Sequence, residues 1–194
     1  VRRVDPRTGS IETIAGTGKG SGERIVFRDW STTPGGVSAD GLPGKLSTLS
    51  FPVDVKVDDA DNVYWYEKGN SRIASLDAAS GTVSVVTSGL AGANVGPIAV
   101  SGSGDVYFAN NVECSIYVVR KGDRVPKRLM GIGTHGVSST PVTTFGTAAF
   151  DTIGAMSFSS QSRLLIYSLG IYEADLEQHT VRVLVSARFG PHPL

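Results

Sequence analysis

The chain has 194 residues and a formal net charge of zero, because 18 Lys and Arg balance 18 Asp and Glu. A general electrostatic attraction to nucleic acid or to an anionic membrane is therefore not expected. One cysteine excludes an internal disulfide framework and a cysteine-rich zinc site. No apolar run approaches the roughly 20 residues that cross a bilayer, so no membrane span is predicted. Frequent glycine, with 24 residues, favours short strands and tight turns in an all-β fold.

The first element, 1–18, reads as two strands joined by a turn. Val1-Arg2-Arg3-Val4-Asp5 and the following residues to Ile14 align without a gap on the later segment 73–86, with Asp5 on Asp77 and Gly9 on Gly81. The first residue is Val rather than Met and lies inside a strand pattern. We expect these two strands to be half of a repeated four-stranded unit, or blade. We also expect the chain to be an excerpt of a longer protein.

A long connector, 19–50, follows, and its run 19–30 has no counterpart in the repeats. A short turn of helix is expected within 44–50. Long loops on a rigid scaffold often carry recognition, and Arg and Trp are enriched in binding hot spots. Arg28 and Trp30 are therefore candidate contacts for a protein partner. The alternative is that the aromatic residues of the loop fold back and seal a blade interface.

The segment 51–89 carries four runs with the two-residue alternation of strands: 53–57, 62–66, 73–77 and 82–86. Trp65, Tyr66 and Lys68 stand at the end of the second run and in the loop after it. They are candidate binding residues on the loop face. The alternative is an ordinary aromatic packed between blades.

The segments 96–133 and 151–190 repeat this four-strand unit, and units of about 40 residues with four strands are typical of propeller blades. The sequence thus predicts one all-β segment, 1–194: a β-propeller of four-stranded blades with about three and a half blades present. Such a ring is incomplete, and its open ends expose strand edges and apolar blade faces. The partner would be another protein or the remainder of its own propeller.

Several phrases resemble the NHL-repeat β-propeller family. They are Ile14-Ala15-Gly16-Thr17-Gly18, Ala39-Asp40-Gly41-Leu42-Pro43-Gly44, Phe51-Pro52-Val53-Asp54-Val55-Lys56-Val57-Asp58 and Gly69-Asn70-Ser71-Arg72-Ile73. The resemblance covers 1–18 and 37–89 well and the rest by spacing and apolar pattern. It implies a ring of five or six blades. It also implies that some relatives bind RNA on a basic face and that others of this architecture are lyases with a histidine-bound zinc.

A local basic cluster surrounds the last turn of the 96–133 unit, with Asp123 opposing it. Its members are Arg120, Lys121, Arg124, Lys127 and Arg128. Five cations on one hairpin suit phosphate contacts, which makes RNA an alternative partner. The other interpretation is a solvated edge hairpin that charge protects from pairing.

Residues for catalysis or cofactors are sparse, so whether the chain is an enzyme is left open, with a non-catalytic role favoured. The glycine-rich run 16–22 lacks the P-loop spacing, and 58–62 lacks the Gly and Glu of an EF-hand. The expected inner strands contain no His for zinc, and Cys114 has no neighbouring His. No cofactor is expected. The sequence favours a scaffold for protein–protein interaction over an RNA-binding face or a fragment of a metal-dependent lyase or hydrolase.

Overall fold

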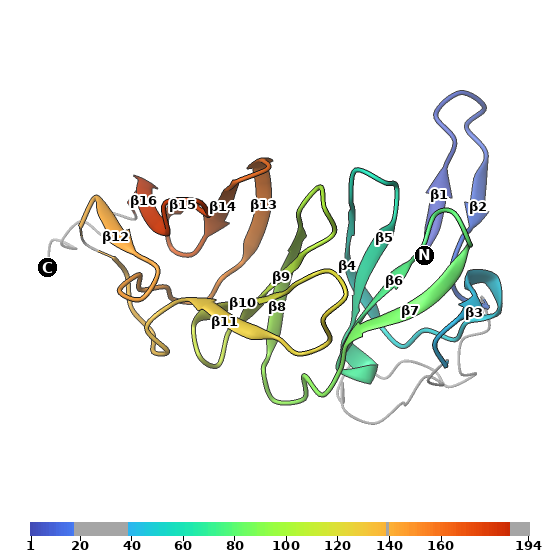
Figure 1. Ribbon diagram of the computed structural model, residues 1–194, viewed down its shortest axis with the longest axis horizontal. Coiled ribbons are helices and arrows are strands. Elements are labelled where there is room, and N and C mark those ends of the chain that lie inside the picture. Colours follow the sequence, from blue (N-terminus) through green and yellow to red (C-terminus); the bar gives the residue numbers. More distant parts are fainter. Residues whose placement is uncertain (18–38, 139, 187–194) are drawn as a thin grey trace, which may run out of the picture. The chain divides into compact units, whose positions relative to one another are not determined.

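The computed structural model describes residues 1–17, 39–138 and 140–186 (Figure 1). Strands make up nearly all of the regular structure, and the only helices of the described part are two three-residue 3-10 turns. The contacts divide the chain into unit 1, Val1–Ala91 with Gly122–Val125, and unit 2, Gly92–Lys121 with Pro126–Leu194. No helix in the described ranges is long and apolar enough to cross a membrane.

Unit 1 begins with a two-stranded hairpin of β1 (Arg2–Val4) and β2 (Ile11–Thr13). Val4 lies opposite Ile11, and the amide of Asp5 donates to the carbonyl of Ser10 at 2.9 Å. Gly9 closes the turn at φ +70°, a backbone conformation that suits glycine. This two-stranded hairpin lies within the range 1–18, where two strands joined by a turn were expected.

The second sheet of unit 1 is an antiparallel meander with one added edge strand. Its order is β3-β7-β6-β5-β4, so consecutive strands from β4 to β7 are neighbours. The elements are β3 (Leu42–Pro43), η1 (Gly44–Leu46), β4 (Pro52–Val57), β5 (Val63–Glu67), η2 (Lys68–Asn70), β6 (Arg72–Leu76) and β7 (Thr82–Thr87). The two-residue strand β3 was not predicted, whereas η1 lies where a short helical turn was expected.

One face of this sheet holds the core of unit 1. Trp65, Ala74, Leu76 and Val83 are buried there together with Ala15, which follows the β1–β2 hairpin. Alternation along β5, β6 and β7 brings these side chains to the same face. Packing thus fixes the register of the strands, since a one-residue slip would move the whole set to the other face of the sheet.

Unit 2 contains two sheets of the same kind. The first has the order β11-β10-β9-β8 and the second the order β12-β16-β15-β14-β13, all antiparallel. The strands are β8 (Val95–Val100), β9 (Val106–Asn110), β10 (Ser115–Val119), β11 (Lys127–Met130), β12 (Val142–Thr144), β13 (Ala155–Ser160), β14 (Arg163–Tyr167), β15 (Ile171–Asp175) and β16 (Thr180–Val185). As in unit 1, a short strand from the connector, β12, pairs with the last strand of its sheet.

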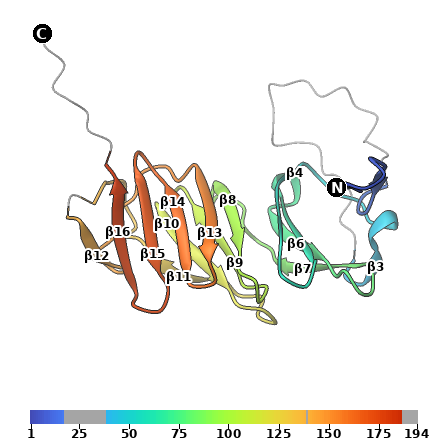
Figure 2. The same cartoon turned by 90° about the horizontal axis from the view of Figure 1, so that it is seen from above.

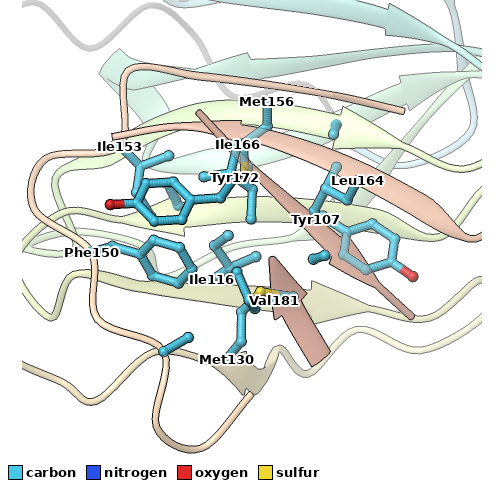
Figure 3. Close-up of a cluster of buried hydrophobic side chains, with 14 of the residues drawn as sticks. Tyr107, Ile116, Met130, Phe150, Ile153, Met156, Leu164, Ile166, Tyr172 and Val181 are labelled. Atoms are coloured by element: carbon cyan, nitrogen blue, oxygen red, sulfur yellow. The ribbon is translucent and has the colours of Figure 1, made fainter. Parts of the chain in front are cut away.

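The core of unit 2 lies between its two sheets, which Figure 2 shows side by side. The β8–β11 sheet contributes Tyr107, Ala109, Ile116 and Val118 from one face. The β13–β16 sheet contributes Leu164, Ile166, Tyr172, Ala174 and Val181 from its facing side (Figure 3). One blade therefore covers the next through interdigitating apolar rows.

An asparagine side chain supports this packing at the loop end. The Nδ2 of Asn111 donates to the carbonyl of Ile153 at 3.2 Å, and the amide of Ile153 donates to Oδ1 of Asn111 at 2.9 Å. The side-chain amide of Asn111 thus both donates to and accepts from the backbone of Ile153, as the backbone of a neighbouring strand would. It joins the β9–β10 turn to the segment that enters β13.

Candidate interaction surfaces

The predicted loop contacts Arg28 and Trp30 lie outside the described residues. The interaction surfaces described below are therefore those of the sheets and of their turns.

Trp65 and Tyr66 are interior residues of unit 1. Trp65 has no exposed surface and belongs to the unit 1 core, and Tyr66 is 4% exposed. Burial raises the pKa of the Tyr66 phenol above its usual value. A partner cannot touch a fully buried indole, so this geometry fits the alternative of an aromatic packed between sheets. Lys68, in η2, is exposed.

The indole of Trp65 belongs to a buried polar network that the sequence reasoning missed. The carboxylate of Glu67 accepts hydrogen bonds from Trp65 Nε1 at 3.0 Å and from Asn70 Nδ2 at 2.6 Å. Arg72 donates to both of its oxygens, through Nε at 3.2 Å and through a terminal nitrogen at 3.1 Å. The spacing of Glu67, Asn70 and Arg72 was the available signal, since a Glu at the end of a strand and an Arg at the start of the next directly face each other.

The Glu67–Arg72 pair is structural in character. Both side chains are almost completely buried, and a buried charge is tolerated when it is paired and hydrogen-bonded. Each carboxylate oxygen already accepts two or more donors, which leaves little capacity for a ligand. The network fixes the η2 turn between β5 and β6, because the network joins residues on both sides of that turn.

The basic cluster is partly neutralised by carboxylates. Arg120 donates to Asp105 at 2.7 Å and to the hydroxyl of Tyr107 at 3.2 Å. Arg124, grouped by its contacts with unit 1, pairs with Asp40 at 2.7 Å. Its guanidinium, with the amide of Val85, holds the pKa of Asp40 below its usual value.

Two further members of the cluster, Lys127 and Arg128, are exposed on the edge strand β11. Adjacent residues of a strand point to opposite faces, so these two cations do not share a surface. Lys121 is exposed in the turn before them. Lys127 and Arg128 therefore do not contribute to one common basic face of β11.

No group of three or more His, Cys, Asp or Glu side chains in 1–17, 39–138 and 140–186 is placed to hold a metal ion. Nδ1 of His135 lies 3.5 Å from Asp151 on the surface, and the ring of His179 lies 5.3 Å from that of Phe145. Cys114 is buried, and burial raises the pKa of its thiol. A protonated thiol is a poor nucleophile.

Asp58, at the acidic turn between β4 and β5, is held by hydrogen bonds from its own turn. Its carboxylate accepts from the amides of Ala60 and Asn62 at 3.0 and 2.9 Å. It also accepts from Asn62 Nδ2 at 2.9 Å and from the Tyr64 hydroxyl at 3.0 Å. Burial acts to raise the pKa of Asp58, but these four hydrogen bonds outweigh it and the pKa is lowered.

Apolar side chains are exposed on blade faces at several places in the described strands. In unit 1 they are Val4 and Ile11 on the β1–β2 hairpin, and Val55 and Val57 on β4. In unit 2 the β13–β16 sheet exposes Tyr167 and Ile171, among others. Large exposed apolar patches commonly mark interaction surfaces.

No family model matches the sequence, and no curated protein matches it. Solved structures do resemble it in fold. A structural genomics protein of unknown function from Bacteroides thetaiotaomicron is 17% identical, with a TM-score of 0.55 over 92% of this chain and 38% of the other. An auxiliary nutrient binding protein from Bacteroides ovatus is 16% identical, with a TM-score of 0.57 over 71% and 37%.

A chain of a nidogen–laminin complex is 14% identical, with a TM-score of 0.54 over 73% of this chain and 50% of the other. The chain thus spans half or less of the length of these three structures. At these identities the likeness concerns the fold. Together with the four-strand antiparallel meander that recurs in three sheets, it identifies the fold as that of a β-propeller, which confirms the predicted fold class.

Proposed function

We propose that the chain is an NHL-type propeller segment that acts as a non-catalytic scaffold for protein–protein interaction, within a larger assembly. The observation that carries the proposal is the exposed pair of Val4 and Ile11, which lie directly opposite each other on the β1–β2 hairpin. The corresponding pair on the β6–β7 hairpin, Leu76 and Val83, is buried in the core of unit 1. An aliphatic pair that this fold buries in one hairpin and exposes in the other suits a protein contact.

The connector 19–36, with Arg28 and Trp30, is proposed as a second contact, and Lys68 as an accessory one. The support is the absence of a repeat counterpart for this loop in the sequence and the enrichment of Arg and Trp in hot spots.

The test is capture of partners by a tagged chain in extracts of the source cells. We expect Ile11→Lys to lower the recovery of bound proteins at least tenfold, and an equal-length Gly-Ser replacement of 19–36 to do the same, with little change in Tm. Ala79→Lys is the matched control, because it adds the same charge to an exposed residue of the β6–β7 turn. A wild-type chain that retains nothing would refute the scaffold, whereas undiminished capture by Ile11→Lys would refute the hairpin as its contact.

An RNA-binding face has weaker support. Two of the five cations, Arg120 and Arg124, are engaged with carboxylates, and Lys127 and Arg128 point to opposite sides of β11. A phosphate backbone needs several cations that act together on one surface. A metal-dependent lyase or hydrolase fragment is supported by no cluster of ligands within the described ranges.

A further inference from the structure

The β13–β16 sheet has two faces of very different exposure. One face carries Leu164, Ile166 and Tyr172 into the unit 2 core. The other face carries a row of directly paired residues across all four strands, namely Ala155, Tyr167, Ile171 and Val185. Every residue of this row is exposed.

The pair of this row on the two middle strands is buried in the other two sheets. Tyr167 and Ile171, paired on β14 and β15, are 55% and 39% exposed. The corresponding pairs on the middle strands are Tyr66–Ile73 in the β4–β7 sheet and Ala109–Ile116 in the β8–β11 sheet. Their exposures are 4% and 0%, and 0% and 0%. The β13–β16 sheet thus repeats a pair that the other two sheets bury, but exposes it to solvent.

Unit 2 also shows what covers such a row. The face of the β8–β11 sheet with Ala109 and Ile116 packs against the aliphatic and aromatic face of the four-stranded β13–β16 sheet. Specific ring contacts join the two, since Tyr107 meets Phe158 edge to face at 5.3 Å. The occupant of this face in the molecule is therefore another blade.

The charged border of the face is repeated as well. Along the two middle strands of the β8–β11 sheet, the apolar pairs are followed by the ion pair of Arg120 and Asp105, at 2.7 Å. In the β13–β16 sheet the equivalent ion pair is Arg163–Asp175, at 2.9 Å, with Glu173 also bonded by Arg182 at 2.9 Å. These four side chains carry two positive and two negative charges, so an apolar partner face would meet paired rather than isolated charges there, although covering them has a desolvation cost.

We propose that the exposed face of the β13–β16 sheet is the docking surface for a further four-stranded propeller blade that lies outside residues 1–194. This inference rests on the proposed scaffold function and names the partner of a second surface. The partner face would carry aliphatic and aromatic side chains like those of Leu164, Ile166 and Tyr172, opposite Tyr167 and Ile171. Docking would remove the exposed apolar surface of these two side chains from water, which favours the bound state.

A second copy of this chain fits the surface less well. The hairpin face that a copy would offer, with Val4 and Ile11, belongs to two strands. The exposed row to be covered crosses four strands, from Ala155 to Val185. A two-stranded partner would leave half of that row in water.

The test is a photo-cross-link from position 167. The protein is expressed in its source cells with p-benzoylphenylalanine in place of Tyr167, and the cross-linked peptides are sequenced. We expect links to a strand of a four-stranded blade outside residues 1–194, and at least a tenfold loss of these links in Ile171→Lys. Position 112 is the matched control, because Val112 is similarly exposed but lies in the β9–β10 turn of the other sheet of unit 2.

Three results would overturn the proposal: links between two copies of this chain, links to a protein without a blade at the linked residues, or no links above those from position 112. Oxidative labelling of Tyr167 in the source cells covers the case in which Ile171→Lys fails to fold. Protection of that ring supports the proposal, and labelling as in the isolated chain contradicts it. Because the capture experiment depends on Ile11, the scaffold contact and the blade surface can fail independently.

Discussion

At the scale of single residues, the acidic turn at Asp58 shows how a loop resembling a calcium site can have a structural role. Its carboxylate accepts four hydrogen bonds from the same turn and from Tyr64 at the start of β5. These donors fix the hairpin between β4 and β5, and hydrogen bonds to a charged acceptor are stronger than neutral ones. The density of carboxylates at 58–61 could be predicted from the sequence, but its role depends on where the donors lie.

We expect Asp58→Asn to lower the free energy of unfolding by about 2 kcal/mol at pH 7, since an amide cannot accept from all four donors. The pKa of Asp58 is lowered in the folded state, so its contribution is complete above the unfolded pKa of about 3.9 and is lost as the pH falls through the folded pKa. The gap between wild type and variant should therefore close on acidification. Urea unfolding from pH 7 to pH 2 measures it.

Asp59→Asn is the control for that series, because Asp59 is exposed beside Asp58. It should unfold like wild type throughout. A gap for Asp58→Asn that stays constant down to pH 2 would show that the carboxylate charge has no part in the effect.

At the scale of elements, the connection into the third strand of each blade takes the same strained form. Ser71, Cys114 and Leu169 stand at matched places, and all three have positive φ values, of 47°, 46° and 48°. A left-handed conformation costs a non-glycine residue about 1–2 kcal/mol. The repeat in backbone conformation is thus more regular than the repeat in sequence, which places Ser, Cys and Leu at this point.

Ser71→Gly should raise the free energy of unfolding by about 0.5–1 kcal/mol, because glycine adopts this conformation without a steric cost. The backbone bonds of Ser71 to Lys68 and Leu90 do not involve the side chain and remain. Chemical unfolding at constant pH measures the change.

The matched control changes the same residue type in ordinary strand geometry. Ser84, exposed in β7, has no positive φ, and Ser84→Gly should lower stability by about 0.5–1 kcal/mol. If both variants shift stability in the same direction, the backbone conformation at Ser71 does not store strain.

The strands themselves could be predicted, because alternating apolar residues bury one face of each sheet. Val63–Glu67 and Arg72–Leu76 lie within a residue of the runs expected at 62–66 and 73–77. The short strands β3 and β12 could not be predicted in the same way. They are two and three residues long and mostly exposed, and they depend on pairing with β7 and β16 rather than on their own pattern.

At the scale of the whole molecule, the fold class followed from the internal repeat, while the site residues did not. The sequence around Trp65 and Tyr66 is compatible with a surface or with a core, and only the three-dimensional structure shows that both side chains are buried. The basic cluster is continuous in sequence, but its partners Asp105 and Asp40 come from other turns. Burial and pairing across distant segments are therefore what the local pattern lacked.

Each unit contains a hydrophobic cluster made only of its own residues, and this predicts where a local defect is felt. Arg72→Leu leaves the Glu67 carboxylate buried without its cation, which should lower the stability of unit 1 by about 3–5 kcal/mol. The core of unit 2 contains no residue of unit 1. In native-state hydrogen exchange, amides of β6 should lose protection, and those of β14 and β15 should change less than threefold.

Arg3→Ala is the control, because Arg3 pairs with Glu12 on the surface, where solvent screens an ion pair and its contribution to stability is small. It should leave both sets of amides nearly unchanged. An equal loss of protection in β6 and β14 of Arg72→Leu would instead show that the chain opens as one cooperative body.

The buried Cys114 makes opening of the β9–β10 turn measurable by thiol modification. The thiol is buried, its Sγ lies 3.8 Å from the carbonyl of Asn111, and it is the single cysteine of the chain. A thiol reagent can reach it only while the β9–β10 turn has swung away, so each modified molecule marks one opening event. Asn111 in the same turn is also hydrogen-bonded to the backbone of Ile153. The rate of Cys114 modification therefore reports how often the contact between the β9–β10 turn and the segment before β13 opens.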